Sequence, residues 1–468
     1  MLFSSLPFLF YFLPCALGLY FLAPRRLKNA ALLLSSLVFY AWGNPTYLIL
    51  MAFSVVFNYI TGLELDAYLQ EERHTGAKVT MISAVVVNLL ILGFFKYYGF
   101  LISTVNSITG LTLSAPELPL PLGISFFTFS VLSYVFDVYR GRAEVQKNFL
   151  DFSLYVTFFA KVTSGPIVQY KDMAPQLRER QMVPAKFGAG ISMFLVGLGK
   201  KVLIADNLGA TFSAISGLST MSAGTAWLGM ILYSLQLYFD FSGYSDMAIG
   251  LAKCFGFDFS ANFDYPYLSA SISEFWRRWH ISLGAWFRDY VYIPLGGNRC
   301  SKHRQLINLA VVWLLTGLWH GSAWNFVLWG VYHGIFVILE KFVLKDIGPR
   351  VPKFLRIFVT TLLVFIGWVL FFSPSLSGAI HYYGQMFGAG HMGLFDGTFR
   401  YYFFGSLRLL IVAFLGCGPI VRRIHQRLCY YKGGKRTYVS VIGFVLLLIL
   451  CVAYMMSATY SSFLYVQF

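Results

Sequence analysis

The chain has 468 residues, of which 57% are hydrophobic and only 12% are charged. The charged share is about half that of an ordinary globular domain. This composition excludes a soluble enzyme, a secreted disulfide-linked scaffold and a disordered chain. A helix that crosses a bilayer needs roughly 20 mostly apolar residues. The sequence therefore predicts an all-α, polytopic helical membrane protein, because windows without Asp, Glu, Lys or Arg cover 1–24, 29–63, 97–116, 118–136, 207–239, 305–339, 357–395 and 437–468.

Apolar segments of spanning length recur along the whole chain. Gly43-Asn44-Pro45 interrupts one window, because proline lacks the amide N–H that a helix interior needs. From the helix length that the hydrocarbon core of a bilayer requires, we expect about eleven spans. They belong to a single domain over 1–468. In chain order we expect helices near 5–23, 30–42, 46–63, 79–95, 97–115, 120–136, 150–168, 187–205, 221–240, 306–320, 324–340, 355–372, 405–421 and 437–456, some of them re-entrant.

The net charge of +16 arises from 36 Lys and Arg residues against 20 Asp and Glu residues. Arg25, Arg26 and Lys28 follow the first span directly, and a second basic cluster lies between 422 and 436. Short connections rich in Lys and Arg stay on the cytoplasmic side. We therefore expect a multi-pass protein of the cytoplasmic membrane, with both basic clusters inside and both termini outside. The expected partner is the lipid bilayer and not a nucleic acid.

The segment 258–304 is polar enough to leave the bilayer core, yet it is rich in Trp and Tyr. At helical periodicity its apolar residues share one face and its charged residues share the opposite face. Glu274 and Arg278 are four apart, in the order that favours a helical ion pair. We expect an interfacial or re-entrant helix, with His280 at the edge of an apolar stripe formed by Trp276, Trp279, Leu283, Trp286, Phe287 and Tyr290.

His320 is an ionisable residue inside the segment 305–340. Such a group is costly in a membrane and is therefore a functional candidate by default. A neutral imidazole can accept a proton and return it later, which acyl transfer to a hydroxyl requires. Alternatively, a neighbouring carbonyl satisfies the ring and its role is structural. The residues alone leave both interpretations open.

His333 and His280 are the two histidines that most invite pairing with His320. On one continuous helix, His320 and His333 would lie about 20 Å apart on different faces and would share neither a metal nor a proton. His333 is then a packing or gating residue. His280 comes from another segment, so it is freer to meet His320.

Asp240 follows the charge-free run 207–239, and a buried carboxylate needs a partner. Arg277, Arg278 or Arg288 offers one. Asp240 then either orients a histidine or a hydroxyl substrate, or belongs to a structural ion pair. No metal site is expected, because the six cysteines form no CxxC pair.

A transporter or flippase for a wall-precursor lipid is a second class of function, in which buried histidines and carboxylates relay protons. Many such proteins have two related halves with a site at the bilayer midplane, and the sequence indicates neither feature. The residues therefore favour an enzyme.

Several stretches resemble the membrane-bound O-acyltransferase (MBOAT) family, and in particular its branch of bacterial polysaccharide O-acetylases. The similarity extends over nearly the whole chain. It is carried by Trp319-His320-Gly321 and by the runs 121–127 (PLGISFF), 137–141 (DVYRG), 165–168 (GPIV), 239–248 (FDFSGYSDMA), 274–283 (EFWRRWHISL) and 288–299 (RDYVYIPLGGNR).

This resemblance implies an O-acetyltransferase whose catalytic histidine is His320, with His280 as a second recurrent histidine. It implies acetyl-CoA as the cytoplasmic donor substrate and no permanently bound cofactor. The acceptor is then an extracytoplasmic polysaccharide, reached through a secreted or membrane-anchored acetyltransferase partner. D-alanyl transfer from a carrier protein to teichoic acid stays open as an alternative.

Five further residues are expected to bind substrate around a central tunnel that leads to His320. Asp240 and Trp319 would line the site, while Arg277 and Arg278 would suit the anionic phosphates of coenzyme A. A donor must also stabilise the tetrahedral oxyanion. Asn325, a tryptophan indole and a backbone N–H are candidates of equal rank.

Overall fold

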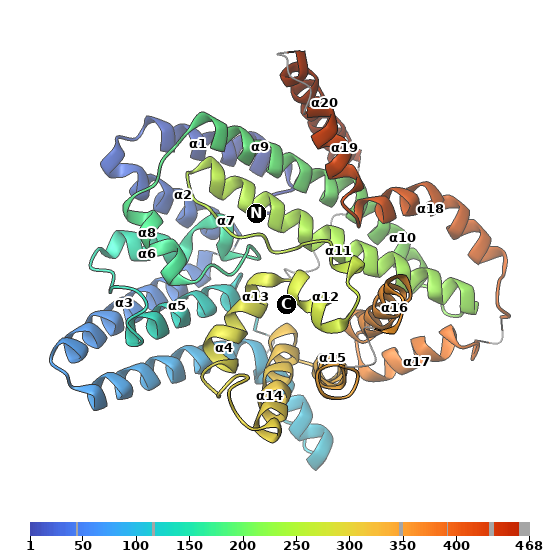
Figure 1. Ribbon diagram of the computed structural model, residues 1–468, viewed down its shortest axis with the longest axis horizontal. Coiled ribbons are helices and arrows are strands. Elements are labelled where there is room, and N and C mark those ends of the chain that lie inside the picture. The colour runs from blue at the N-terminus through green and yellow to red at the C-terminus, as the bar shows by residue number, and fades with distance from the viewer. Residues whose placement is uncertain (44, 115–117, 346–349, 391, 430–434, 458–468) are drawn as a thin grey trace. The chain divides into compact units, whose positions relative to one another are not determined.

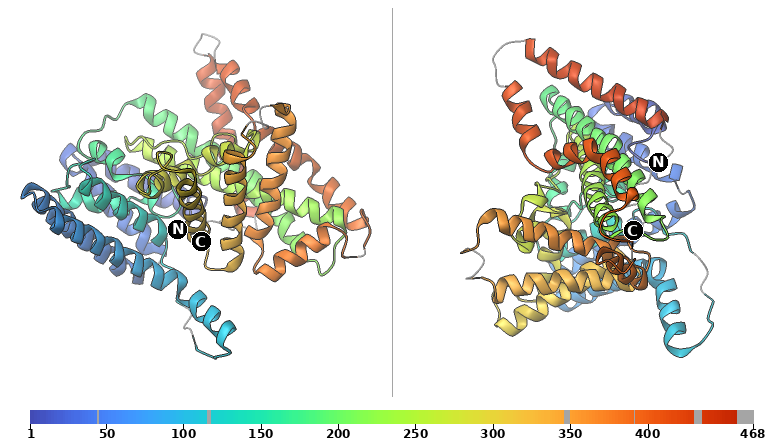
Figure 2. Two further views of the ribbon diagram at one scale, coloured as in Figure 1. Left: turned by 60° about the horizontal axis from the view of Figure 1, so that its bottom comes forward. Right: turned by 90° about the vertical axis from the view of Figure 1, so that its right-hand side faces the viewer.

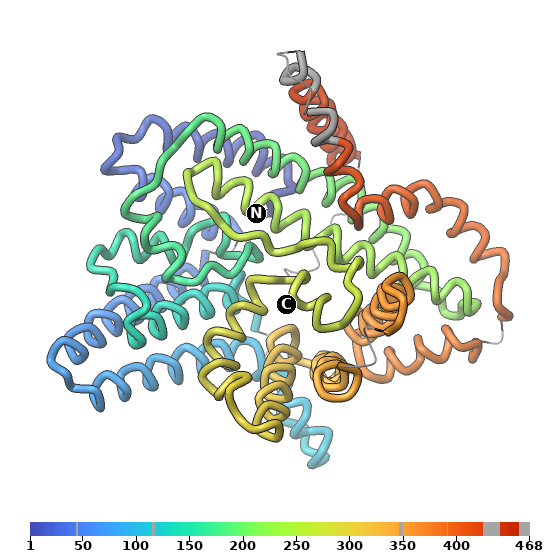
Figure 3. Tube along the Cα trace, viewed as in Figure 1, coloured from blue at the N-terminus to red at the C-terminus, as the bar shows by residue number. Residues whose placement is uncertain are grey.

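The computed structural model describes residues 1–43, 45–114, 118–345, 350–390, 392–429 and 435–457, and the side chains of all of these except 425–439 (Figure 3). Every regular element within these residues is a helix, as the composition predicts. The chain forms two compact units. Unit 1 comprises Met1–Phe194 with Ala248–Ser260, and unit 2 comprises Leu195–Met247 with Ala261–Phe468.

Unit 1 contains the N-terminal helices, drawn in blue to green in Figure 1. A pair of buried amides joins helices α3 (Leu48–Gln70) and α4 (His74–Thr109) inside the apolar bundle. Asn58 Nδ2 donates to Asn88 Oδ1 at 3.1 Å, and Asn88 Nδ2 donates to Asn58 Oδ1 at 2.8 Å. The elements are η1 (Phe8–Phe12), α1 (Leu13–Leu22), η2 (Arg25–Leu27), α2 (Lys28–Gly43), η3 (Pro45–Tyr47), α3 (Leu48–Gln70), α4 (His74–Thr109), α5 (Ile124–Tyr139), α6 (Phe149–Thr157), α7 (Phe159–Val162) and α8 (Tyr170–Arg178).

Unit 2 carries the histidines of interest. Helices α9 (Pro184–Gly199) and α11 (Ala223–Cys254) contribute residues to both units. Three neighbouring helices run alongside one another in the left panel of Figure 2: α14 (Lys302–His320), α15 (Trp324–Phe342) and α16 (Lys353–Phe372). The remaining elements are η4 (Lys200–Ala205), α10 (Asp206–Ser216), η5 (Pro266–Leu268), α12 (Ile272–Arg278), α13 (Ile281–Phe287), η6 (Arg288–Tyr292), α17 (Leu376–Met386), α18 (Gly397–Gly416), α19 (Ile420–Cys429) and α20 (Lys435–Ser457).

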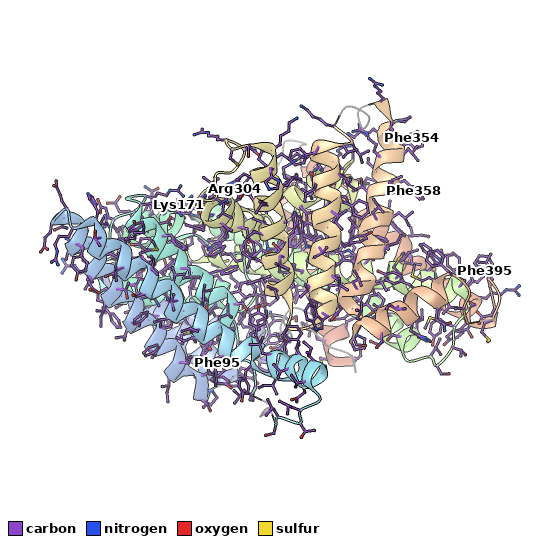
Figure 4. The ribbon with its side chains drawn as sticks, turned by 90° about the horizontal axis from the view of Figure 1, so that it is seen from below. Phe95, Lys171, Arg304, Phe354, Phe358 and Phe395 are labelled. Carbon is purple, nitrogen blue, oxygen red and sulfur yellow. The ribbon has the colours of Figure 1, made fainter. Side chains whose placement is uncertain are left out.

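The described residues contain 6 helical stretches that are long and apolar enough to cross a membrane. Their outward faces are apolar: Phe354 and Phe358 on α16 are 75% and 63% exposed and project away from the ribbon (Figure 4). Such faces suit hydrocarbon and not water. The chain is therefore a multi-pass membrane protein, with candidate spans at Pro45–Gln70, His74–Thr109, Pro184–Ser216, Lys353–Phe372, Gly397–Gly416 and Ser440–Ser457.

Two of the expected span boundaries are wrong. The spans near 79–95 and 97–115 form one continuous helix, α4, of 36 residues. No proline separates them, and Lys96 between them is buried within the protein. The span near 150–168 is instead interrupted at Phe158, whose backbone (ψ 116°) leaves the helical region between α6 and α7.

The single helix expected to carry the aromatic stripe 276–290 is instead broken in two, because the chain bends at Trp279 and His280 between α12 and α13. Most of the aromatic stripe is buried within the protein. The predicted helical ion pair is confirmed, since Arg278 Nη2 lies 2.7 Å from Glu274 Oε1. Glu340, near the end of α15, holds the start of α12 by accepting the backbone N–H groups of Ile272 and Ser273 at 2.5 and 2.8 Å.

Glycines bring α14 and α15 into direct backbone contact. A Cβ added at Gly330 would lie 2.5 Å from the Trp313 carbonyl oxygen and 2.9 Å from Gly317 Cα. Gly334, one turn further along α15, packs against the Trp313 side chain, where an added Cβ would come within 2.9 Å. Small residues four apart on a helix permit this close approach in membranes, where packing replaces the hydrophobic effect as the driving force.

Buried charge pairs join η4 to α11 within unit 2. Lys201 Nζ lies 2.9 Å from Asp240 Oδ1 and 2.5 Å from Asp206 Oδ1, and Lys201 and Asp240 are each only 1% exposed. Helices α9 and α11 also approach closely near this ion pair. A Cβ added at Gly197 on α9 would come within 2.5 Å of the Gly243 carbonyl oxygen on α11. The Lys201 ammonium group thus forms ion pairs with two carboxylates.

The glycine contact predicts that Gly330→Ala separates α14 from α15 and destabilises the protein. Inserting a methyl group against rigid backbone costs about 1–3 kcal/mol. The apparent melting temperature in detergent should fall, whereas the matched variant Gly405→Ala on α18, where an added Cβ meets nothing within 4 Å, should leave it unchanged. Equal melting temperatures for the two variants would contradict the packing argument.

The buried pair predicts a large penalty for Lys201→Met. Removing one partner strands an uncompensated charge, at a cost of about 3–5 kcal/mol. The control is Arg178→Met, which breaks an ion pair with Glu144 whose side chains are 57% and 79% exposed. Thermal unfolding should show a marked loss for the first variant and almost none for the second. Wild-type stability of Lys201→Met would refute a structural role for the pair.

Candidate active site

His320 is the last residue of α14, and it is almost fully buried, with 1% of its surface exposed. The helix ends there because Gly321 is extended (φ −167°, ψ 159°). A side chain at Gly321 would clash with the ring of Phe326, since an added Cβ would lie 2.1 Å from Cδ2. Glycine at this position therefore lets the chain turn into α15 at once, and the turn leaves the imidazole at a helix end inside the unit.

Aromatic rings surround the His320 imidazole. The ring centroid of Trp329 on α15 lies 4.8 Å away, nearly perpendicular at 81°, and that of Phe371 on α16 lies 5.3 Å away. Trp319 lies 4.9 Å from His320 and 5.8 Å from His280. The site is thus an apolar enclosure in which an electrostatic interaction is stronger than in water.

His280 occupies the bend between α12 and α13 with φ 46°, a left-handed conformation that is costly for a residue other than glycine. Asn262 holds the bend: its Oδ1 lies 3.2 Å from His280 Nδ1 and also accepts the Ser282 hydroxyl at 2.9 Å. An amide oxygen only accepts, so the ring donates from Nδ1. Burial lowers the pKa of the His280 imidazole to about 3, and the ring is therefore neutral at physiological pH.

The structure thus brings both His280 and His320 into contact with the ring of Trp319. Strained backbone that is held by tertiary hydrogen bonds concentrates at functional sites. This geometry agrees with a shared site but does not by itself assign chemistry to His280.

The expectation that His333 lies far from His320 is wrong. It assumed one continuous helix, whereas the break at Gly321 folds α15 back along α14. The rings of both histidines therefore pack against Trp329, whose centroid lies 4.8 Å from that of His320 and 5.0 Å from that of His333. His333 is fully buried, and its ring also lies 4.9 Å from that of Trp276.

The expected arginine partner of Asp240 is also wrong. Its carboxylate pairs with Lys201, which comes from η4 and not from the segment 258–304. The residue after Asp240 contacts the site, since the ring of Phe241 packs edge-on against His280 at 4.7 Å.

Arg277 and Arg278, at the end of α12, are not buried as the three histidines are. Arg277 is exposed, while Arg278 is half-buried and paired with Glu274. Their proposed contact with coenzyme A phosphates stays a prediction. Arg288, the third arginine considered, is paired with Asp289 through its Nε at 2.8 Å.

Asn325 joins the start of α15 to the end of α16. Its Nδ2 donates to the Leu370 carbonyl at 3.0 Å and to the Ser373 carbonyl at 2.8 Å. An amide nitrogen has two hydrogens, so both are already committed. This arrangement favours a structural role over donation to an oxyanion.

Sequence reasoning missed three residues that shape this site: Asn262, Lys201 and Trp329. Lys201 had a signal, because a lysine in a mostly apolar stretch must find a partner. Asn262 and Trp329 had none, since their roles depend on contacts between distant segments. Among the described residues, no group of three or more His, Cys, Asp or Glu side chains is placed to hold a metal ion.

Comparison with known proteins relates this chain to acyl transfer. Residues 42–383 match the model of the membrane-bound O-acyltransferase family. The chain is 45% identical over 394 residues to the probable alginate O-acetylase AlgI of Pseudomonas aeruginosa, covering 83% of this chain and 75% of the relative. It is 35% identical over 431 residues to the peptidoglycan O-acetyltransferase of Helicobacter pylori, covering 84% and 81%.

A third relative is the teichoic acid D-alanyltransferase of Bacillus subtilis, which is 29% identical over 236 residues, covering 47% of this chain and 59% of the relative. The family model spans most of the chain, and its matched region contains both His280 and His320. The chain is an O-acyltransferase and belongs to the membrane-bound O-acyltransferase family.

Proposed function

We propose that this chain transfers an acetyl group from cytoplasmic acetyl-CoA toward the hydroxyls of an extracytoplasmic polysaccharide. The relatives named as acetylases of alginate and peptidoglycan support both the acyl group and the class of acceptor. The observation that carries the proposal is the burial of His320 at the end of α14, inside an aromatic enclosure that also reaches His280. Burying an ionisable side chain among aromatic rings costs free energy, and such a residue is therefore a candidate for a catalytic role.

The proposed mechanism uses His320 as a general base and then as a general acid. Its imidazole takes the proton of the attacking hydroxyl while the oxygen bonds to the thioester carbon. The carbonyl electron pair moves to oxygen and forms a tetrahedral oxyanion. When the carbonyl re-forms, the C–S bond breaks and the departing thiolate takes the proton back from the imidazolium. The products are an ester and a free thiol.

The proposed topology has about eleven spans around a tunnel that opens to both sides of the cytoplasmic membrane. The basic residues near 25–28 and 422–436 would lie inside, and the two termini outside. The donor thioester then enters from the cytoplasm and the hydroxyl from the opposite face. A secreted or membrane-anchored acetyltransferase would carry the acetyl group onward to the polymer.

The proposal predicts that His320→Ala abolishes acetyl transfer while the protein still reaches the membrane. Loss of a positioned general acid–base typically costs about 10²–10⁴-fold in rate. The readout is labelled acetate transferred from acetyl-CoA by purified protein in vesicles. His303→Ala removes an exposed histidine from the same helix and should retain activity. Near-wild-type transfer by His320→Ala would end this mechanism.

A competing outcome is transfer of D-alanine, which the relative named as a teichoic acid D-alanyltransferase raises. A strain lacking this chain should lose alkali-labile acetate from its polysaccharide and keep its ester-linked D-alanine. Chromatography of both hydrolysates measures the two together. Loss of D-alanine with unchanged acetate would replace the acetyl assignment with the D-alanyl one.

A further inference from the structure

Buried indole N–H groups gather around the histidines of unit 2. In the described residues, the Nε1 atoms of Trp276, Trp279, Trp329 and Trp368 are buried and have no hydrogen-bond acceptor. A buried donor without an acceptor ordinarily costs about 1–3 kcal/mol. Native proteins hold only a few such groups per 100 residues, and each calls for an explanation. Their concentration here indicates a place where an acceptor atom is expected to arrive.

Trp329 is distinguished from the other three by its contact with His320. The two ring centroids lie 4.8 Å apart and the rings are nearly perpendicular. Neither Trp276, Trp279 nor Trp368 has such a contact, among those described, with that imidazole. An oxygen that reacts beside His320 would therefore lie next to the Trp329 ring.

The Trp329 ring is also held rigidly. Trp368 stacks on it at 5.6 Å and 22°, and Phe371 packs against its edge at 5.3 Å. His333 fixes it from one turn further along α15, at 5.0 Å. Gly330, the residue after Trp329, contacts the backbone of α14. This contact fixes the position of that turn of α15 against α14. A donor that need not reorganise during the reaction is the kind that stabilises a developing charge most effectively.

We propose that the indole N–H of Trp329 donates a hydrogen bond to the oxyanion that forms while His320 holds the hydroxyl proton. This inference rests on the proposed acyl transfer and assigns one of its missing parts. The N–H keeps its proton throughout, and only the hydrogen bond strengthens as the carbonyl oxygen gains negative charge. Asn325 does not compete for the role, because both of its N–H groups already bind carbonyls.

The test compares Trp329→Phe with Trp279→Phe in the vesicle assay with acetyl-CoA. Both substitutions remove a fully buried indole whose Nε1 lacks an acceptor, so they should destabilise the protein to a similar degree. Loss of an oxyanion donor should lower kcat of Trp329→Phe by about 10²–10³-fold, with the KM for acetyl-CoA changed little. Trp279→Phe should stay within a few-fold of wild type.

Equal losses in the two variants would reveal a packing effect and overturn the assignment, as would near-wild-type kcat in Trp329→Phe. If Trp329→Phe does not fold, 3-benzothienylalanine at position 329 keeps the bicyclic shape and replaces the N–H with sulfur. The same loss of kcat is then expected, and full activity would refute the role. His320→Ala and wild type in the same assay report separately on the proposed function, since an inactive wild type would count against acetyl transfer itself.

Discussion

The close approach of α14 and α15 through Gly317 and Gly330 is the constraint on which the active-site geometry depends. It lets the chain fold back directly after Gly321, so that a residue at the end of one helix meets a residue within the next. His320 and Trp329 become neighbours for this reason. In a bilayer such contacts are made by packing small residues against backbone, and larger side chains there would move the two rings apart.

Polar groups inside the described part of unit 2 fall into two kinds. Some form hydrogen bonds or ion pairs that join helices: Lys201 lies between two carboxylates, Asn325 donates through its Nδ2 to two carbonyls, and Glu340 accepts at the start of α12. Others are buried donors without acceptors, such as the indole N–H of Trp329. The first kind holds the helices in place. The second kind can still donate a hydrogen bond to an acceptor that binds beside His320. An enzyme that stabilises charge inside a membrane needs both.

The sequence was sufficient to predict the helical class, the helices near 306–320 and 324–340 and the burial of His320, because apolar runs determine them locally. It did not predict the bend at His280, which depends on a hydrogen bond to the distant Asn262. Nor did it predict the pairing of Asp240 with Lys201, since helical spacing says nothing about which helix lies opposite. Local patterns thus identified the elements, whereas their partners depended on tertiary packing.

The most direct test of this account is an experimental structure of the protein with a non-hydrolysable thioether analogue of acetyl-CoA. We expect the carbonyl oxygen of the analogue about 3 Å from Trp329 Nε1, with the acyl carbon facing the His320 imidazole. An acyl group bound away from both rings, with the aromatic enclosure closed around His320, would contradict the assignment of this pair as the reaction centre.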